Sequence, residues 1–217
     1  MAIIQNPLSE RISGSYGNAV LVNKYGKTYL RLKPFNFKDA KTPKQLARRE
    51  RLRIANMLIK PVLPVIREAY AGILTSMSPY NKAISLIMKG AYAGDSPVLD
   101  HSKVMFCDNE GSTVANVHLT TLPSQVVQVT WEPGTTNKRD LQSYLTFIVI
   151  NTRENKAIVL RDIALRYEGT ATFTLQKTWS GCGIALHVVT TDSTQLRNGQ
   201  PGIIIKFRAG LEEIPFI

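Results

Sequence analysis

The chain has 217 residues, 44% of them hydrophobic, and a formal net charge of +11. This length and hydrophobic content can supply more than one packed core, which excludes general disorder, and the longest apolar runs fall far short of the roughly 20 residues of a membrane-spanning helix. The charge is uneven: of the 27 Lys and Arg and the 16 Asp and Glu, residues 1–100 hold 16 and 6, whereas residues 101–217 hold 11 and 10.

The start of the chain lacks the features of a secretory signal. Residues 1–10 contain no basic cluster followed by an apolar stretch of about 7 or more residues. We therefore expect synthesis in the cytoplasm and no export through a signal peptide. The two cysteines, Cys107 and Cys182, are too few for a chain of this size that depends on disulfides, so we expect two reduced, half-buried thiols.

A β-hairpin is predicted for residues 18–33, around a short polar turn that contains Gly26. Alternation along its second strand divides the side chains between two faces. The faces hold Thr28, Leu30 and Leu32 on one side and Tyr29, Arg31 and Lys33 on the other. One face can pack, and the other presents cations and an aromatic ring to solvent or to a partner. The preceding residues, 13–17, are predicted to form a loop.

A helix is predicted to begin at residue 43. Thr42 has the character of an N-cap, Pro43 suits the first helical position, and Gln45 completes a capping box. Apolar residues recur on one side of this helix, and cations at spacings of three and four occupy the rest of its surface.

Prolines are expected to shape the remaining helical pattern. Pro61 and Pro64 should bend or restart the first helix, so a second helical piece is predicted for residues 62–71. Ser78 and Pro79 repeat the N-cap and proline pattern, and apolar residues then recur at helical spacing. They predict a third helix, packed inward.

A domain boundary is predicted at residue 97, where turn formers interrupt the helical pattern and the hydrophobic period changes from 3.6 to 2. The fold expected is an α+β N-terminal part over residues 1–97, with the hairpin and about three helices, followed by an all-β immunoglobulin- or fibronectin-III-like sandwich over residues 98–217. Strands are predicted near residues 102–107, 113–119, 125–131, 143–150, 156–165, 169–176, 184–191 and 202–208.

Known catalytic and metal-binding motifs do not occur in the sequence. The tripeptide 26–28 resembles the end of a phosphate-binding loop, but that motif requires Gly where this chain has Leu21, and it requires a following helix. The three histidines lie far apart and lack the short spacings of metal ligands. No serine occupies a nucleophile elbow. We therefore expect no enzyme activity, no cofactor and no metal site.

The positive chemical signal is the basic segment over residues 24–60. Helix N-termini carry partial positive charge and favour acidic residues, yet cations crowd the start of this helix, at a cost of a few tenths of a kcal/mol each unless an anion neutralises them. Helix N–H groups, cations and the hairpin aromatics together predict a surface that binds an anion or a partner. The candidate residues are Lys27, Tyr29, Arg31, Lys41, Lys44, Arg48, Arg49, Arg51 and Arg53.

Three interpretations of this surface stay open. The cations could be solvated, with their aliphatic stems covering apolar surface. They could dock on an acidic protein surface or a neighbouring subunit. They could also contact the phosphates of a nucleic acid, although no recognised DNA or RNA module covers the segment. No membrane partner is expected.

Short motifs along the chain carry a resemblance. They are Asn6-Pro7-Leu8, Gly14-Ser15-Tyr16-Gly17-Asn18, Gly26-Lys27-Thr28-Tyr29-Leu30-Arg31, Thr42-Pro43-Lys44-Gln45-Leu46-Ala47-Arg48-Arg49, Met77-Ser78-Pro79-Tyr80-Asn81, Thr130-Trp131, Gly169-Thr170-Ala171-Thr172 and Trp179-Ser180-Gly181. Together they resemble an uncharacterised family of proteins of about 200 residues from Bacteroidota and their phages and mobile elements. The resemblance covers the full chain and implies a domain of unknown function, with no catalytic residue to carry over.

A looser likeness concerns residues 26–31 and the Arg-rich helix that follows. These segments are similar to parts of phage-encoded structural proteins, which implies an assembly role by analogy. We therefore predict a non-enzymatic structural or assembly protein, of phage or prophage type and incorporated into a virion. It would dock through its basic N-terminal surface, use the sandwich as a second interaction surface, and form a homo- or hetero-oligomer. The alternative is a nucleic-acid-binding protein that uses the basic helix over residues 42–60.

Overall fold

The computed structural model describes residues 2–4, 13–24, 27–35, 39–71, 77–94, 96–108, 114–122, 125–191 and 206–215, with the backbone alone described at 2–4, 24, 191 and 206–215. The chain divides into two compact units. The first comprises Met1–Thr42 with Thr75–Met77, and the second comprises Pro43–Leu74 with Ser78–Ile217.

The first unit contains a four-stranded antiparallel sheet in the order β1-β4-β3-β2. Its strands are β1 (Ala2–Ile4), β2 (Gly14–Tyr16), β3 (Ala19–Lys24) and β4 (Lys27–Leu32). The predicted hairpin is confirmed, since β3 and β4 pair around residues 25–26. The predicted loop at 13–17 is wrong, because Gly14–Tyr16 pairs with β3 across a two-residue turn. Gly17 has a φ of 55° in that turn, a left-handed conformation that glycine adopts without strain.

The predicted alternation along β4 is confirmed by the register. Leu30 and Leu32 lie opposite Leu21 and Ala19 on one face of the sheet, and Tyr29 and Arg31 lie on the other face opposite their own β3 partners. Burial along the apolar face is incomplete. Thr28 is 1% exposed, whereas Leu32 at the far end of the strand is 77% exposed.

Two helices open the second unit. α1 (Pro43–Ala69) and α2 (Pro79–Gly90) begin at the predicted residues, and the Ser78 hydroxyl caps α2 by accepting a hydrogen bond from the Asn81 N–H at 3.3 Å. Pro61 and Pro64 do not restart the first helix. α1 runs through both prolines for 27 residues, and the predicted piece at 62–71 is its C-terminal part.

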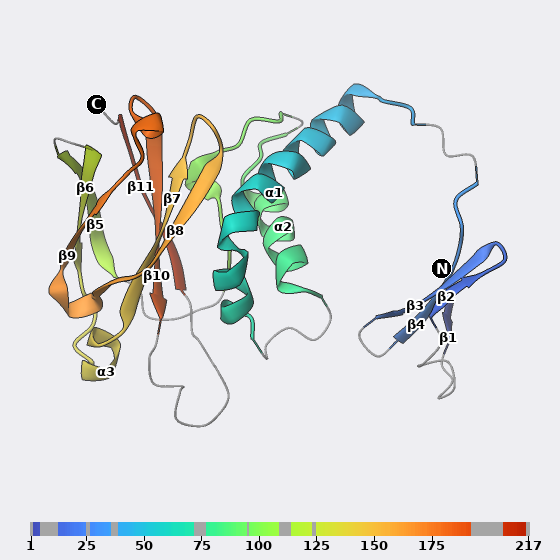
Figure 1. The fold of residues 1–217 in the computed structure, drawn as a ribbon, viewed down its shortest axis with the longest axis horizontal. Helices are drawn as coiled ribbons and strands as arrows, with labels where there is room; N and C mark the ends of the chain where they lie inside the picture. The colour runs from blue at the N-terminus through green and yellow to red at the C-terminus, as the bar shows by residue number, and fades with distance from the viewer. Residues whose placement is uncertain are drawn as a thin grey trace. The chain divides into compact units, whose positions relative to one another are not determined.

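The position of the prolines explains this continuity. Both lie on the exposed side of α1, where the carbonyl groups that lose their helical partner can bond to water. Figure 1 shows that α1 changes direction along its length. The opposite side of the same stretch is held in the core by Leu58, Val62 and Ile66, each 0% exposed.

The strands of the second unit form two antiparallel sheets, ordered β11-β10-β7-β8 and β5-β6-β9. The strands are β5 (Ala115–Leu122), β6 (Val126–Glu132), β7 (Tyr144–Asn151), β8 (Lys156–Leu165), β9 (Thr170–Thr174), β10 (Gly183–Thr191) and β11 (Lys206–Pro215). A core that includes Trp131, Phe147 and Phe173 fills the space between the sheets. The rings of Trp131 and Phe147 meet edge to face with centroids 6.0 Å apart.

Most strand predictions are confirmed to within three residues at each end, but β11 runs on to Pro215, seven residues past its predicted end. The strand predicted near 102–107 is wrong, because this segment contains the short helix η2 (His101–Lys103), which the Asp100 carboxylate caps. Residue 113 and residues 202–205 of two other predicted strands lie outside the described residues. Three further short helices, α3 (Lys138–Leu141), η4 (Arg166–Glu168) and η5 (Lys177–Trp179), connect the strands.

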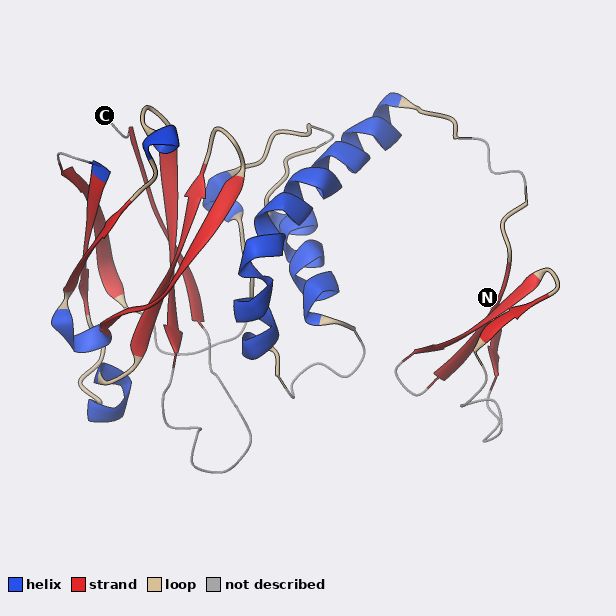
Figure 2. Ribbon diagram, viewed as in Figure 1, coloured by secondary structure: helices blue, strands red, loops and turns tan. Residues whose placement is uncertain are grey.

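Helices α1 and α2 pack on the β11-β10-β7-β8 sheet, on the face opposite the three-stranded sheet. One core cluster joins Leu58 of α1 and Ile87 of α2 to Ile148 of β7 and Ala185 and Val189 of β10. The second unit is therefore a three-layer structure of helices, sheet and sheet (Figure 2).

The division between the compact units does not coincide with the boundary predicted at residue 97. The division falls between Thr42 and Pro43, because the helices share a core with the sheet that follows them. The sequence contained a sign of this arrangement, the continuous apolar run from Phe147 to Ile150. β7 is buried at every position from Leu145 to Ile150, as expected for a strand covered on both faces.

Candidate functional site

The nine predicted site residues form two sets, one in each compact unit. Lys27, Tyr29, Arg31 and Lys41 belong to the first unit, and Lys44, Arg48, Arg49, Arg51 and Arg53 lie on α1 of the second.

The set in the first unit is centred on one face of the sheet. Lys27, Tyr29 and Arg31 alternate with apolar positions along β4, so their side chains share a face. Lys27 and Arg31 are exposed, and Tyr29 is half-buried. Lys41 lies outside the sheet and is exposed, with a φ of 47°.

Arg53 is engaged by the one acidic residue of its own helix turn. Its Nε atom lies 2.8 Å from Oε2 of Glu50, and its Nη2 atom lies 2.6 Å from Oε1. The hydrogen bonds from Arg53 lower the pKa of the Glu50 carboxyl below its usual value. Because this bidentate pair cancels the charge of Arg53, the residue contributes less to a docking surface than the sequence suggests.

Arg51 connects α1 to the segment that follows α2. Its Nη2 atom donates to the Gly94 carbonyl at 2.6 Å, and its guanidinium lies 5.4 Å from the centroid of the Tyr92 ring. The Tyr92 hydroxyl in turn donates to the Arg51 carbonyl at 2.9 Å. Burial raises the pKa of Tyr92 to about 12, against the opposing effect of the Arg51 charge. Arg51 therefore has a structural role as well as a position at the site described next.

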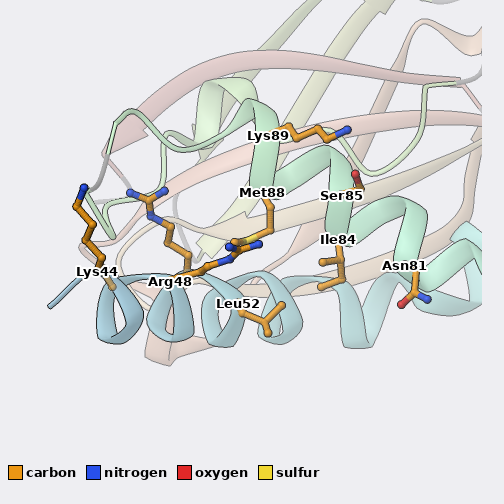
Figure 3. Close-up of a pocket in the computed structure, with 10 residues that line it drawn as sticks. Lys44, Arg48, Leu52, Asn81, Ile84, Ser85, Met88 and Lys89 are labelled. Carbon is orange, nitrogen blue, oxygen red and sulfur yellow. The ribbon is translucent and has the colours of Figure 1, made fainter. Parts of the chain in front are cut away.

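A groove of about 740 Å³ lies between α1 and α2 (Figure 3). Four of its lining residues are cations and none is acidic. The apolar lining comes from both helices, with Ala47 and Leu52 on α1 and Ile84 and Met88 on α2. The complete lining is Lys44, Ala47, Arg48, Arg51, Leu52, Asn81, Ile84, Ser85, Met88 and Lys89.

The burial pattern of α1 explains why a groove forms here. Every buried residue of this helix lies at Ile54 or later, so residues 43–53 extend past the core. α2 buries only Ala83 and Ile87, which leaves Ile84 and Met88 half-buried beside the early turns of α1. The helices therefore present an apolar strip that no side chain of the described residues fully covers.

The electrostatics of the groove are positive along the α1 wall and at the end of the α2 wall that holds Lys89. Lys44 and Arg48 line it from α1 and Lys89 lines it from α2, and all three side chains are exposed (Figure 3). Within the described part of the chain, Arg48 has no ion-pair partner. The first turn of α1 contains no acidic residue, so the helix dipole adds to the positive potential.

A polar cluster joins α1, α2 and the segment that leads into the sandwich. The Tyr70 hydroxyl donates to Oδ1 of Asp108 at 2.6 Å, and Nζ of Lys82 lies 2.6 Å from Oδ2 of the same carboxylate. Burial raises the pKa of Asp108, but the hydrogen bonds from Lys82 and Tyr70 outweigh burial and leave the pKa lowered. The cluster satisfies its own polar groups and is structural, and its members are too far apart in sequence to be predicted from spacing.

The remaining reactive side chains are also accounted for by the fold. Cys107 and Cys182 form no disulfide, as predicted, but they are buried and not half-buried. His101 hydrogen-bonds to Oδ1 of Asn155 at 3.0 Å. Across the described ranges, no three His, Cys, Asp or Glu side chains are placed to bind a metal ion. Among the helices that the structure describes, none is long and apolar enough to cross a membrane.

The second unit thus defines a class of protein, an antiparallel two-sheet structure with a helical hairpin on one face and a basic groove in that hairpin. The chain belongs to the family of unknown function DUF6266, whose model matches residues 11–200. This match confirms the sequence resemblance to an uncharacterised family. No curated protein and no solved structure matches the chain.

Proposed function

We propose that this chain is a non-enzymatic docking protein of a larger assembly, and that it binds an acidic protein surface or a neighbouring subunit through the groove between α1 and α2. The observation that carries the proposal is the composition of that groove, with four cations, an apolar lining from both helices and no carboxylate. An acidic partner with some apolar surface would neutralise the cations and cover the strip together.

A helix face that is merely solvated, without a partner, explains these features of the groove less well than docking does. Solvated cations normally lie over their own aliphatic stems and leave little large apolar surface uncovered. Here Leu52, on the α1 wall of the groove, is 42% exposed, and Ile84 and Met88 on the α2 wall are half-buried. Large apolar side chains beside a set of like charges are more typical of an interface than of a solvent-facing surface.

The assembly that we propose is a virion of phage or prophage type, with Bacteroidota as hosts. Support comes from the likeness of residues 26–31 and of the Arg-rich helix to segments of phage structural proteins. We also propose that the sandwich belongs to the immunoglobulin and fibronectin-III class and serves as a second interaction surface. Its seven antiparallel strands, divided into sheets of four and three, support that assignment.

A nucleic-acid-binding role is the second candidate. The observation that favours it is the face of β4 on which Lys27 and Arg31 flank Tyr29, since cations with an aromatic ring form a platform for single-stranded nucleic acid. The version that relies on α1 is less favoured, because Arg53 is paired with Glu50 and Arg51 bonds to Gly94.

Light scattering after size exclusion tests the proposal on the untagged full chain expressed in its natural host. A docking protein should elute with an acidic protein partner, at an absorbance ratio typical of protein, and should lose that partner as salt rises from about 50 to about 500 mM. A variant with Arg48→Glu and Lys89→Glu should lose the partner at low salt. The matched control carries Lys60→Glu and Arg67→Glu, two exposed cations of α1 outside the groove.

The outcomes separate the two candidate functions. A monomer at every salt concentration would contradict docking. A complex whose absorbance ratio shows nucleic acid, and which the groove variant retains, would favour the second candidate.

A further inference from the structure

We infer that the occupant of the groove is an acidic amphipathic α-helix of a partner protein. This inference rests on the proposed docking function and adds the shape and chemistry of the bound segment.

The walls of the groove are two helices, and each wall contains apolar side chains that the rest of the described structure does not fully cover. Ile84 and Met88 of α2 are half-buried, and Leu52 of α1 is 42% exposed. A strip of this kind between two packed helices is the surface on which a third helix packs, with interaxial distances of about 8–10 Å. A helix occupant would therefore complete the apolar contacts that α1 and α2 begin.

The dimensions set the length of the bound helix. The lining spans residues 44–52 of α1 and 81–89 of α2, nine residues of each helix, which corresponds to a groove about 13 Å long. An occupant of about three turns would span it. Its apolar side chains would recur at positions i, i+3, i+4 and i+7, the spacing of helices that bind in grooves.

The charges set the chemistry of the bound helix. Cations stand on both sides of the apolar strip, with Lys44 and Arg48 on α1 and Lys89 on α2 (Figure 3). An occupant that matches them carries Asp or Glu on both flanks of its apolar stripe. The phosphates of a nucleic acid could contact the cations, but a nucleic acid has no aliphatic groups to cover the apolar strip. A fatty acid could cover the strip, but its single charge at one end cannot pair with cations on both sides.

Two synthetic peptides of identical composition test the inference against the full chain. Both contain only leucine, alanine and glutamate over about 15 residues. In the first, the leucines follow the i, i+3, i+4, i+7 spacing, and in the second they are distributed around the helix. By fluorescence anisotropy, the first peptide should bind at least about 10-fold more tightly than the second, because only it places its leucines together on the strip. A single-stranded oligonucleotide and laurate serve as competitors, and neither should displace the first peptide at equal concentration.

Substitution of two exposed leucines of α1 localises the site. Leu52→Asp places a carboxylate in the groove lining and should weaken binding of the first peptide at least about 10-fold. Leu46→Asp is the matched control, since Leu46 is similarly exposed on the same helix but does not line the groove, and it should change the affinity less than about 2-fold. Far-UV circular dichroism should show unchanged helix content in both variants.

The results that overturn the inference are distinct from those that overturn docking. Equal affinity for the two peptides, equal effects of the two leucine substitutions, or displacement by the oligonucleotide or laurate would each exclude an amphipathic helix as the occupant. Docking on another kind of acidic surface would survive such a result, provided that the Arg48→Glu and Lys89→Glu variant still loses its partner in the light-scattering experiment. If that variant retains its partner and neither peptide binds, the proposed function and the inference both fail.

Discussion

At the scale of single residues, His187 carries the clearest cost of burial. It lies on β10 at 1% exposure, and its ring meets the Phe106 ring edge to face with centroids 5.3 Å apart. Its Nε2 atom has no hydrogen-bond partner among the described residues. Burial, with a further electrostatic contribution from His101, lowers the pKa of His187 to about 4.

This pKa predicts a pH-dependent stability. Because the folded pKa is lower than the unfolded value of about 6.5, the unfolded chain takes up a proton first as the pH falls. The contribution of His187 is complete above about pH 6.5 and is lost between about pH 6.5 and pH 4, on the order of 3 kcal/mol of unfolding free energy. In His187→Phe this part of the loss should disappear. Urea unfolding at pH 7 and pH 4.5 measures it.

The control for this prediction is His118→Gln, because His118 is exposed on β5. It should leave the pH dependence close to that of the natural chain. An unchanged pH dependence in His187→Phe would show that His187 is not the group that titrates.

The cations of the site could be read from the sequence, but their contacts could not all be foreseen. The pairing of Arg53 with Glu50 follows from a spacing of three residues on a helix. The bond from Arg51 to Gly94 spans 43 residues and has no local signal. The apolar lining of the groove was also missed, because Ile84 and Met88 fit the pattern of an inward-facing stripe whether or not another element covers them.

At the scale of secondary structure, α1 tests how proline is accommodated in a long helix. Proline in a helix interior costs about 3 kcal/mol relative to alanine, and part of that cost remains where the helix bends to accept it. Pro61→Ala should therefore raise the free energy of unfolding, by about 1–2 kcal/mol, since the Pro61 side chain is exposed and its loss removes no core contact. Urea unfolding at pH 7 measures the change. A decrease would mean that the bend at this position is needed for packing on the sheet.

Local sequence signals identified most elements of the second unit, and their failures have physical reasons. Ser78 and Pro79 fixed the start of α2 because a capping side chain and a proline act within one turn. A strand was predicted near residues 102–107, but the Asp100 carboxylate caps the short helix η2 at residues 101–103. β1 and β2 have three residues each, which is too short for a periodic pattern to be recognised.

At the scale of the whole molecule, the shared core makes the helical hairpin necessary for the sandwich. Without α1 and α2, the face of the central sheet that contains Ile148, Ile150 and Val189 would meet water. We expect a protein of residues 39–217, which retains Thr42 ahead of α1, to be folded and soluble. A protein of residues 98–217, cut at the boundary predicted from sequence, should aggregate or lose fixed packing around Trp131. Yield of soluble protein and dispersion of the amide spectrum compare the two, and a well-folded 98–217 fragment would contradict the shared core.

The compact units divide between Thr42 and Pro43, whereas the boundary predicted at residue 97 follows the change of hydrophobic period. A change of hydrophobic period marks where helices give way to strands, but it does not reveal whether the two kinds of element share a core. The decisive information was the burial of β7 on both faces, which requires a layer on each side. The positive charge of the first 100 residues could be predicted, because it follows from composition alone. Its division between the two compact units could not be predicted, because it depends on which elements share a core.

The most direct test of docking through the helical hairpin is a map of amide chemical shifts on the full chain during titration with the acidic peptide whose leucines share one face. If the peptide docks in the groove, the changes should concentrate in residues 44–52 of α1 and 81–89 of α2, which hold the lining residues. Changes centred on β3 and β4, or on the sheet of β5, β6 and β9, would contradict docking in the groove.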